Sequence, residues 1–300
     1  MIFCISLVEM HVQNSVDRSA ADATPTSIPD ASTERVFCMP SFEPVTAALR
    51  VLEVLFALNR LKEASVGDLF RETGLNRPTI VRMLETLIHA GLVARHPTRA
   101  VYVTTGRTLE LSSGYQKHEE MALAAAPILA RLHNALQWPS DVSVFDGDAM
   151  VVARTSRSEG VLHFNRRPGY RAPLLGTSLG MAFLAFCDPK TRAQALAVLA
   201  ASDDPWNAVV HDPERLERLL ASVRDNGYAS MNKDYSRTSY NGVASAIGVP
   251  VLIGGVAVGS LNLMYLRNSL GEADVVARFV APLRAAAAEI ADALAAMRGE

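Results

Sequence analysis

The chain has 300 residues, of which 49% are hydrophobic and 20% are charged, and its formal net charge is −2. This length allows one large domain or two ordinary ones with a substantial core. With a net charge this close to zero, the chain as a whole does not attract nucleic acid electrostatically. Any contact with nucleic acid must therefore come from a local basic patch. Cys4, Cys38 and Cys187 lack the spacing of a disulfide framework or a zinc site. We therefore expect a reduced, cytoplasmic protein without a metal or other cofactor.

The first forty residues differ in composition from the rest of the chain. Residues 1–10 are apolar, but the run is too short to span a bilayer and lacks the basic start of a signal peptide. Residues 13–40 are rich in Ser, Ala, Asp, Thr and Pro, which cannot bury enough surface to fold. We expect residues 1–40 to be a disordered leader, with Met10 and Met39 as alternative start codons, and we expect no membrane association.

Residues 41–105 predict a winged helix-turn-helix domain. A first helix is indicated by apolar residues at helical spacing, namely Val45, Leu49, Leu52, Leu55, Phe56 and Leu58. A second helix follows Ser65 as N-cap and ends at Gly74. A third helix ends at Gly91 and has an inner face of Ile80, Val81, Leu84, Leu87 and Ile88. Two alternating runs around His96–Arg99 then predict a hairpin, which completes the order of elements of a winged helix-turn-helix.

The third helix carries side chains suited to reading double-stranded DNA. Arg77, Thr79 and Arg82 lie near its N-terminal end, where a reading helix projects hydrogen-bond donors toward bases and phosphates. The residues that we assign to operator DNA are Ser65, Arg77, Pro78, Thr79, Arg82, Arg95 and Arg99. Residues 41–105 contain eight Lys or Arg against six Asp or Glu, a net charge of only +2, so charge alone does not exclude an ordinary helical subdomain.

A second, α+β domain is predicted over residues 138–300, joined to the first by helical linker residues 106–137. Two strands meet at a turn over 146–148. The remaining predicted elements are helices near 189–201 and 212–226, strands near 243–253 and 256–266, and a helix over 272–298. Strands that alternate with helices in this way predict a sheet covered by helices.

The segment PLLGTSLGMAFLAF contains Gly176-Thr-Ser-Leu-Gly180, the G-x-S-x-G turn of many serine hydrolases. Such an enzyme needs an acid and then a histidine after Ser178, but only His211 follows and it precedes a helix. A serine hydrolase is therefore the less favoured alternative. Thr177 or Ser178 can instead cap the helix that begins here, and the amides of Ser178 and Leu179 at its positive end would bind a carboxylate. We favour this carboxylate site over the alternative, a capped core helix with nothing bound.

Over about residues 42–298 the chain resembles the IclR family of bacterial transcription regulators. The resemblance is carried by ASVGDLFRETGLNRPTIVRMLETLIHAGLV, RAPLLGTSLGMAFLAF and GYASMNKDYSRTSYNGVASAIGVPVL. The segments WPSDVSVFDGDAMVVARTS and HFNRRPGYRAPLLGTSLGMAFLAFCDP look closest to regulators of 3-(3-hydroxyphenyl)propionate and similar aromatic-acid catabolism. The resemblance implies a GAF-like effector-binding domain and a non-enzymatic regulator. A homodimer or dimer of dimers would present paired recognition helices to a pseudo-palindromic operator.

The resemblance also implies which residues contact the effector. These are Ser178, Leu179, Tyr235, Val243, Ser245, Asn262 and Met264, and we add Thr177 from the same turn. We add Arg171, Arg154 and His163 as candidate partners for a carboxylate. The expected function is ligand-responsive regulation of a catabolic operon, with an aromatic or phenylpropanoid carboxylic acid as effector. A sensor that has lost DNA binding and regulates a protein partner is a further alternative.

Overall fold

A computed structural model describes residues 42–115, 117–156 and 166–299. The leader predicted over 1–40 and the candidate residue His163 lie outside the described residues. The winged-helix unit and the effector unit are described separately below. Among the described residues, no helix combines the length and the hydropathy needed to cross a membrane.

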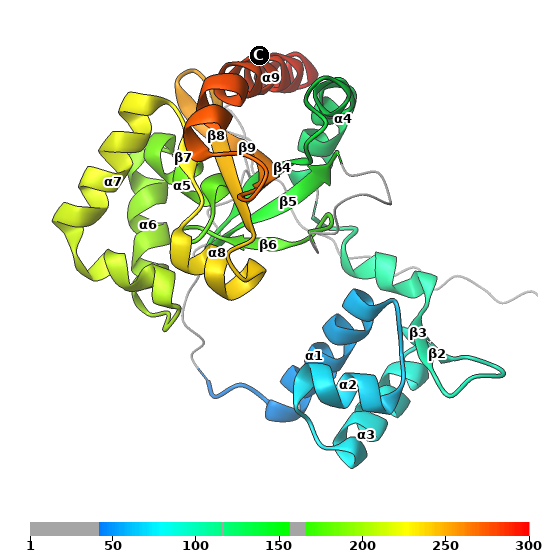
Figure 1. Ribbon diagram of the computed structural model, residues 1–300. Coiled ribbons are helices and arrows are strands. Elements are labelled where there is room, and N and C mark those ends of the chain that lie inside the picture. Colours follow the sequence, from blue (N-terminus) through cyan, green and yellow to red (C-terminus); the bar gives the residue numbers. More distant parts are fainter. Residues whose placement is uncertain (1–41, 116, 157–165, 300) are drawn as a thin grey trace, which may run out of the picture. The chain divides into compact units, whose positions relative to one another are not determined.

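The first unit confirms the predicted winged helix-turn-helix. Its helices are α1 (Thr46–Leu61), α2 (Val66–Thr73) and α3 (Arg77–His89) (Figure 1). A three-stranded antiparallel sheet has the order β1 (Glu63–Ala64), β3 (Tyr102–Thr104), β2 (Val93–Arg95). The short strand β1 was not predicted. Ser65 and Asp68 form a capping box at the start of α2, and Gly74 ends this helix with a φ of 69°.

The apolar residues that predicted α1 divide between two sides of the helix. Leu55 and Leu58 are buried together with Val54 and Ala57, which face α2 and α3. The outer side of the helix and the residues before it carry an apolar stripe that is exposed, consisting of Phe42, Val45, Leu49, Leu52 and Phe56. These residues recur every three or four positions, so they lie on one side of the helix, away from the core. On α3, similarly, Val81 is exposed and Met83 is buried.

The second unit is built on one six-stranded antiparallel sheet. Its strand order is β6 (Arg171–Pro173), β5 (Ala149–Thr155), β4 (Ser140–Asp146), β9 (Val256–Leu266), β8 (Ala244–Ile253), β7 (Ala229–Ser230). The helices of this part of the chain are η1 (Gly106–Leu111), α4 (Lys117–Leu136), α5 (Ser178–Phe186), α6 (Pro189–Ala200), η2 (Pro205–His211), α7 (Pro213–Asn226), α8 (Lys233–Tyr240) and α9 (Glu272–Arg298). The predicted α+β class is confirmed.

Helices cover both faces of this sheet (Figure 1). α4 and α9 pack side by side on one face, and α5 lies against β8 and β9 on the other, with α7 behind it. Most of the predicted helical linker over residues 106–137 is the helix α4, which packs on the sheet. Met121, Ala125 and Leu129 of this helix belong to the same buried cluster as the sheet, because the apolar side of α4 has the sheet to pack against.

The face of the sheet toward α5 carries a buried polar row. Asp141 and Ser143 of β4 lie beside Ser260 and Asn262 of β9, and all four side chains are fully buried. Ser143 Oγ and Ser260 Oγ are 3.0 Å apart, and Asn262 Oδ1 accepts the Asp141 amide at 2.9 Å. Burying polar groups is unfavourable unless they are hydrogen-bonded. Core packing alone would favour apolar side chains at these four positions, so it does not explain why they are polar.

Two glycines allow α5 to approach the sheet and its own entry loop. A Cβ at Gly248 on β8 would lie 2.6 Å from the carbonyl oxygen of Ser178. A Cβ at Gly180 would overlap the backbone of Leu174. Neither position has room for a methyl group, so both glycines of this contact are required by packing.

Gly180→Ala should therefore destabilise the effector unit. We expect a loss of about 1–3 kcal/mol in the free energy of unfolding, because the added methyl must displace the Leu174 backbone. Urea unfolding followed by circular dichroism measures this loss. Gly114→Ala is the matched control, since a Cβ at Gly114 meets no atom within 4 Å. Equal unfolding midpoints for the two variants would contradict the close packing of α5.

Candidate DNA and effector sites

One groove of the winged-helix unit collects residues from three elements. Ser65 and Gly67 at the start of α2, Arg77 at the start of α3, and Arg95 and Tyr102 of the wing line a groove of about 550 Å³. The positive ends of two helices and two arginines thus meet at one concave surface. Such a surface attracts phosphate groups.

Arg77 and Arg82 lie on different sides of α3. Both are exposed, and neither forms an ion pair with another described residue. Arg77 lies beside the Phe70 ring, whose centroid is 5.9 Å from its Cζ, in the groove near the wing. Arg82 instead lines a groove between α1 and α3 together with Val51 and Val81.

The predicted wing arginines are already paired within the domain. Arg99 donates to both carboxylate oxygens of Glu63 at 2.8 and 2.7 Å, and Arg95 donates to Glu85 at 2.9 Å. Exposed pairs of this kind contribute little to stability, so these arginines can exchange a carboxylate for a phosphate at small cost. Of the remaining predicted residues, Pro78 is exposed and Thr79 is half-buried, while the Ser65 hydroxyl is used by the cap of α2.

In the effector unit, the predicted carboxylate site at the start of α5 is enclosed rather than open. Thr177, Ser178 and Leu179 are all fully buried. Thr177 Oγ1 caps the helix by accepting the Gly180 amide at 3.2 Å, so Thr177 rather than Ser178 is the N-cap. Leu179 packs in an apolar cluster. Gly248 of β8 lies against the carbonyl group of Ser178, so the start of α5 packs directly on the sheet.

The effector unit also contains a buried arginine that was not among the predicted site residues. Arg166 is 2% exposed and donates from Nε to Tyr240 Oη at 2.8 Å. Its Nη1 lies 4.0 Å from Asp141 Oδ2, and neither Nη1 nor Nη2 has a hydrogen-bond partner. Burial lowers the pKa of Arg166, whereas the nearby Tyr240 and Asp141 oxygens raise it. The second effect is larger, so the pKa of Arg166 lies above its usual value. The guanidinium is therefore charged.

Four aromatic rings surround this guanidinium or adjoin it. The ring centroids of Tyr170 and Tyr240 lie 5.3 and 5.7 Å from Arg166 Cζ. Tyr170 Oη and Tyr235 Oη are 2.7 Å apart, and Trp206 meets the Tyr235 ring edge-on at 5.0 Å. Burial raises the pKa of Tyr235 to about 12, so its hydroxyl remains protonated at neutral pH.

Several other polar atoms around these rings also lack partners. They are Ser178 Oγ, Trp206 Nε1, Asn207 Oδ1 and Asn262 Nδ2. Gly176, next to the α5 cap, lies against Tyr235 and Trp206, while Asn262 is the register partner of Gly248, which contacts Ser178. These contacts connect the atoms into one region. We call it the buried effector cluster, and it consists of Arg166, Tyr170, Ser178, Trp206, Tyr235, Tyr240 and Asn262.

The structure brings some of the predicted effector residues into this cluster and places others elsewhere. Tyr235 and Met264 pack together, and Asn262 lies on the same face of β9 as Met264, as strand alternation predicts. Val243 is 49% exposed just before β8. Ser245 points to the opposite face from Ala244 and Ala246, because alternate strand residues face opposite ways.

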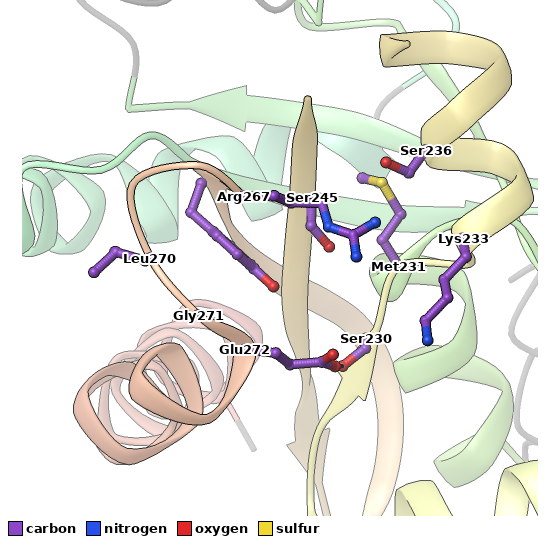
Figure 2. A pocket seen from close by; sticks show the side chains of 10 residues that line it. Ser230, Met231, Lys233, Ser236, Ser245, Arg267, Leu270, Gly271 and Glu272 are labelled. Carbon is purple, nitrogen blue, oxygen red and sulfur yellow. Dashed lines mark hydrogen bonds between the residues drawn. The ribbon is translucent and has the colours of Figure 1, made fainter. Parts of the chain in front are cut away.

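Ser245 lines a different pocket, of about 200 Å³, which Figure 2 shows. Lys233, Arg267 and Glu272 lie around it, and Ser230 Oγ donates to Glu272 at 2.7 Å. All three of these charged side chains are exposed. Ser245 is therefore not part of the buried effector cluster.

The predicted carboxylate partner Arg171 is also outside the cluster. Its guanidinium is exposed and pairs with Asp146, at 2.5 Å, and with Asp148 at the turn between β4 and β5. Arg154 is likewise exposed. Arg171 starts β6 with its side chain outward, whereas Arg166, five residues earlier, is enclosed by residues from distant segments. The sequence contains one indication of a buried polar site. Asp141 is an acidic residue within a predicted strand, and it lies on the same face of that strand as Ser143.

The structure excludes a catalytic role for Ser178. Its hydroxyl is fully buried without a hydrogen-bond partner, and His211 is exposed on η2. A nucleophilic serine needs a base within hydrogen-bond reach. Within the described parts of the chain, no group of His, Cys, Asp and Glu is arranged to hold a metal ion.

A winged helix-turn-helix and an α+β effector unit in one chain define a one-component transcription regulator. The model of the IclR helix-turn-helix domain matches residues 47–97, and that of the bacterial transcriptional regulator IclR C-terminal domain matches residues 113–292. The chain therefore belongs to the IclR family of DNA-binding, non-enzymatic regulators.

Relatives and solved structures agree with this assignment. The Pca regulon regulatory protein of Pseudomonas putida is 26% identical over 249 residues, covering 82% of this chain and 83% of the relative. The transcriptional regulator KdgR of Escherichia coli is 24% identical, covering 83% and 92%. An IclR homologue from Microbacterium hydrocarbonoxydans, solved with 4-hydroxybenzoate, has a TM-score of 0.59 at 25% identity, covering 84% of this chain and all of that one.

Proposed function

We propose that the chain senses an aromatic or phenylpropanoid carboxylic acid in its effector unit and thereby regulates a catabolic operon. The observation that carries this proposal is the buried effector cluster. It combines aromatic rings with polar atoms that have no partner in the protein. An unpartnered buried polar group costs about 1–3 kcal/mol, and a ligand that supplies the missing partners recovers this cost on binding.

The chemistry of the cluster favours an aromatic ring with polar substituents. Tyr235, Tyr240 and Trp206 offer ring faces and edges, which favour stacked or edge-on contact with another ring. Ser178 Oγ and Asn262 Nδ2 can hydrogen-bond a ring hydroxyl. The 4-hydroxybenzoate bound to the Microbacterium homologue has this chemistry and supports the proposal.

A thermal-shift panel tests the effector class. We expect hydroxylated benzoates, phenylacetates, cinnamates and phenylpropionates to include at least one stabilising ligand. At a hundred times its Kd a ligand stabilises the folded state by about 2.7 kcal/mol. The same ligand should change the affinity for the operator in a mobility-shift assay, using DNA upstream of the chain's own gene. Sugar acids serve as controls, and a flat response to the aromatic panel would reject the aromatic-acid assignment.

For the DNA interface we propose Arg77 and Arg82 as the main reading residues, with Arg95 and Arg99 at phosphates and Ser65, Pro78 and Thr79 beside them. Arg77 and Arg82 are exposed on α3 and free of ion pairs among the described residues, so neither must give up a carboxylate to reach DNA. The wing arginines Arg95 and Arg99 are paired with carboxylates, so each must exchange its carboxylate for a phosphate when it binds DNA.

Arg77→Ala and Arg82→Ala should each weaken operator binding by about 1–3 kcal/mol, because a base-reading arginine contributes that much discrimination. Mobility shifts at several salt concentrations measure the loss. Arg60→Ala is the control, since Arg60 is exposed on α1 and paired with Glu72. Unchanged affinity in both α3 variants would contradict this interface. If the variants lose affinity equally for all DNA sequences, and their affinity depends less steeply on salt concentration, these residues contact phosphates instead.

We further propose that the protein acts as a homodimer or dimer of dimers, with the exposed stripe of α1 as one contact. Val45, Leu49, Leu52 and Phe56 follow a spacing of alternating three and four residues, which is the seam pattern of paired helices. A contiguous exposed apolar stripe of this kind is typical of protein–protein contacts.

Leu49→Glu should shift the protein toward monomers, because it places a charge in the proposed helix seam. Size-exclusion chromatography with light scattering measures the mass, and a mobility shift measures the accompanying loss of operator affinity. Thr46→Glu adds the same charge to α1 at a position outside the stripe and should leave the mass unchanged. A Leu49→Glu protein with the wild-type mass would show that this stripe is not an interface.

A further inference from the structure

The guanidinium of Arg166 has unused hydrogen-bonding capacity in a fully buried position. Of its donors, Nε is bonded to Tyr240 Oη at 2.8 Å. Nη1 and Nη2 have no hydrogen-bond partner. Buried arginines are normally paired, because an unpaired buried charge is strongly unfavourable. The two terminal nitrogens of Arg166, Nη1 and Nη2, which together form the fork of the guanidinium, therefore lack a partner.

The neighbouring carboxylate does not fill this role. Asp141 Oδ2 lies 4.0 Å from Arg166 Nη1, at the limit of an ion pair and beyond hydrogen-bond distance. Asp141 cannot easily move closer, because its backbone is fixed in β4, where its amide donates to Asn262 Oδ1 at 2.9 Å. It neutralises much of the arginine charge without occupying the donors.

The orientation of the fork is fixed by the surrounding rings. Tyr170 and Tyr240 have their ring centroids 5.3 and 5.7 Å from Arg166 Cζ, within the range of cation–π contact. The Nε bond to Tyr240 removes one more degree of freedom. A guanidinium held in this way is preorganised for a planar, two-oxygen acceptor, which is the geometry of a carboxylate.

We propose that Arg166 binds the effector carboxylate through Nη1 and Nη2, and that Asp141 limits the site to a single negative charge. This inference rests on the proposed sensing of an aromatic acid by the same cluster, and it names the residue that selects the charge. The carboxylate anchor is then the guanidinium, not the amides at the start of α5. Tyr240 is a positioning residue, because it acts through Arg166.

Asp141 has a defined consequence for specificity. A bound carboxylate would place a second negative charge beside Asp141 at the same guanidinium. A second charge on the ligand adds repulsion in a region with little water, where charge–charge energies are large. Monocarboxylates are therefore favoured over dicarboxylates of similar shape. Asp141→Asn removes this repulsion and should tighten monocarboxylate binding.

Calorimetric titration of the full chain tests the anchor. The probes are 3-(3-hydroxyphenyl)propionate and 4-hydroxybenzoate, each compared with its neutral amide. Arg166→Met should weaken binding of the acid by about 10- to 100-fold, as expected for lost hydrogen bonds to a charged group. The amides should bind weakly to the wild type and be affected little by the substitution. Arg166→Lys should recover part of the affinity, because it keeps the charge without the fork.

Two further variants control for charge and folding. Arg171→Met removes a nearby exposed arginine that is paired with Asp146 and Asp148, and it should bind both acids like the wild type. Arg166→Met removes the positive charge beside Asp141, so the double variant Asp141→Asn/Arg166→Met removes both charges of the pair together. Circular dichroism and thermal unfolding show which variants are folded. The double variant should also lose the preference for acid over amide.

The outcomes separate this inference from the proposed function. A wild type that binds an acid and its amide equally well overturns the role of Arg166 while aromatic sensing stands. The same holds for a folded double variant that retains the acid preference. Unchanged or weaker monocarboxylate binding in Asp141→Asn overturns the role of Asp141. A wild type that binds neither probe nor any acid of the panel removes the proposed effector class, and this inference with it.

Discussion

The effector unit depends on one constraint, namely that a charged arginine is kept inside a sheet-and-helix core. Arg166 is enclosed by Tyr170, Tyr235 and Tyr240, and it faces Asp141 on the central strand β4. The polar row on β4 and β9 continues this environment across the sheet. A core optimised only for stability would fill such a region with apolar side chains, because buried ion pairs contribute little net stability. These retained polar groups are the feature on which the proposed effector site rests.

The close packing of α5 serves the same region. Gly248 and Gly180 bring the start of α5 against β8 and against Leu174, and Gly176 just before this helix lies against Tyr235 and Trp206. The G-x-S-x-G pattern is thus explained by backbone approach and a Thr177 cap, not by nucleophilic chemistry. The same glycines occur in hydrolase turns because both structures need backbone without side chains.

The sequence predicted those features that depend on neighbouring residues in the chain. It did not predict those that depend on contacts between residues far apart in the chain. Caps at Ser65 and Gly74 and helical periodicity predicted the winged helix-turn-helix, and alternation placed Asn262 and Met264 on one face. The burial of Arg166 could not be predicted in this way. Its contacts Tyr240 and Asp141 lie 74 and 25 residues away, and nothing in the HFNRRPGYRAP segment distinguishes it from the exposed Arg171. Tertiary contacts alone separate a surface arginine from a buried one.

An effector can regulate DNA binding only as far as its affinity differs between two states of the protein. The buried effector cluster offers a physical source for that difference. Arg166, Asn262 and Ser178 hold polar atoms that lack partners, which makes the packing of this region less stable than a fully bonded core. Under the proposed function, a ligand that completes these bonds stabilises this packing. It biases the regulator only as far as the same bonds are missing in the other state.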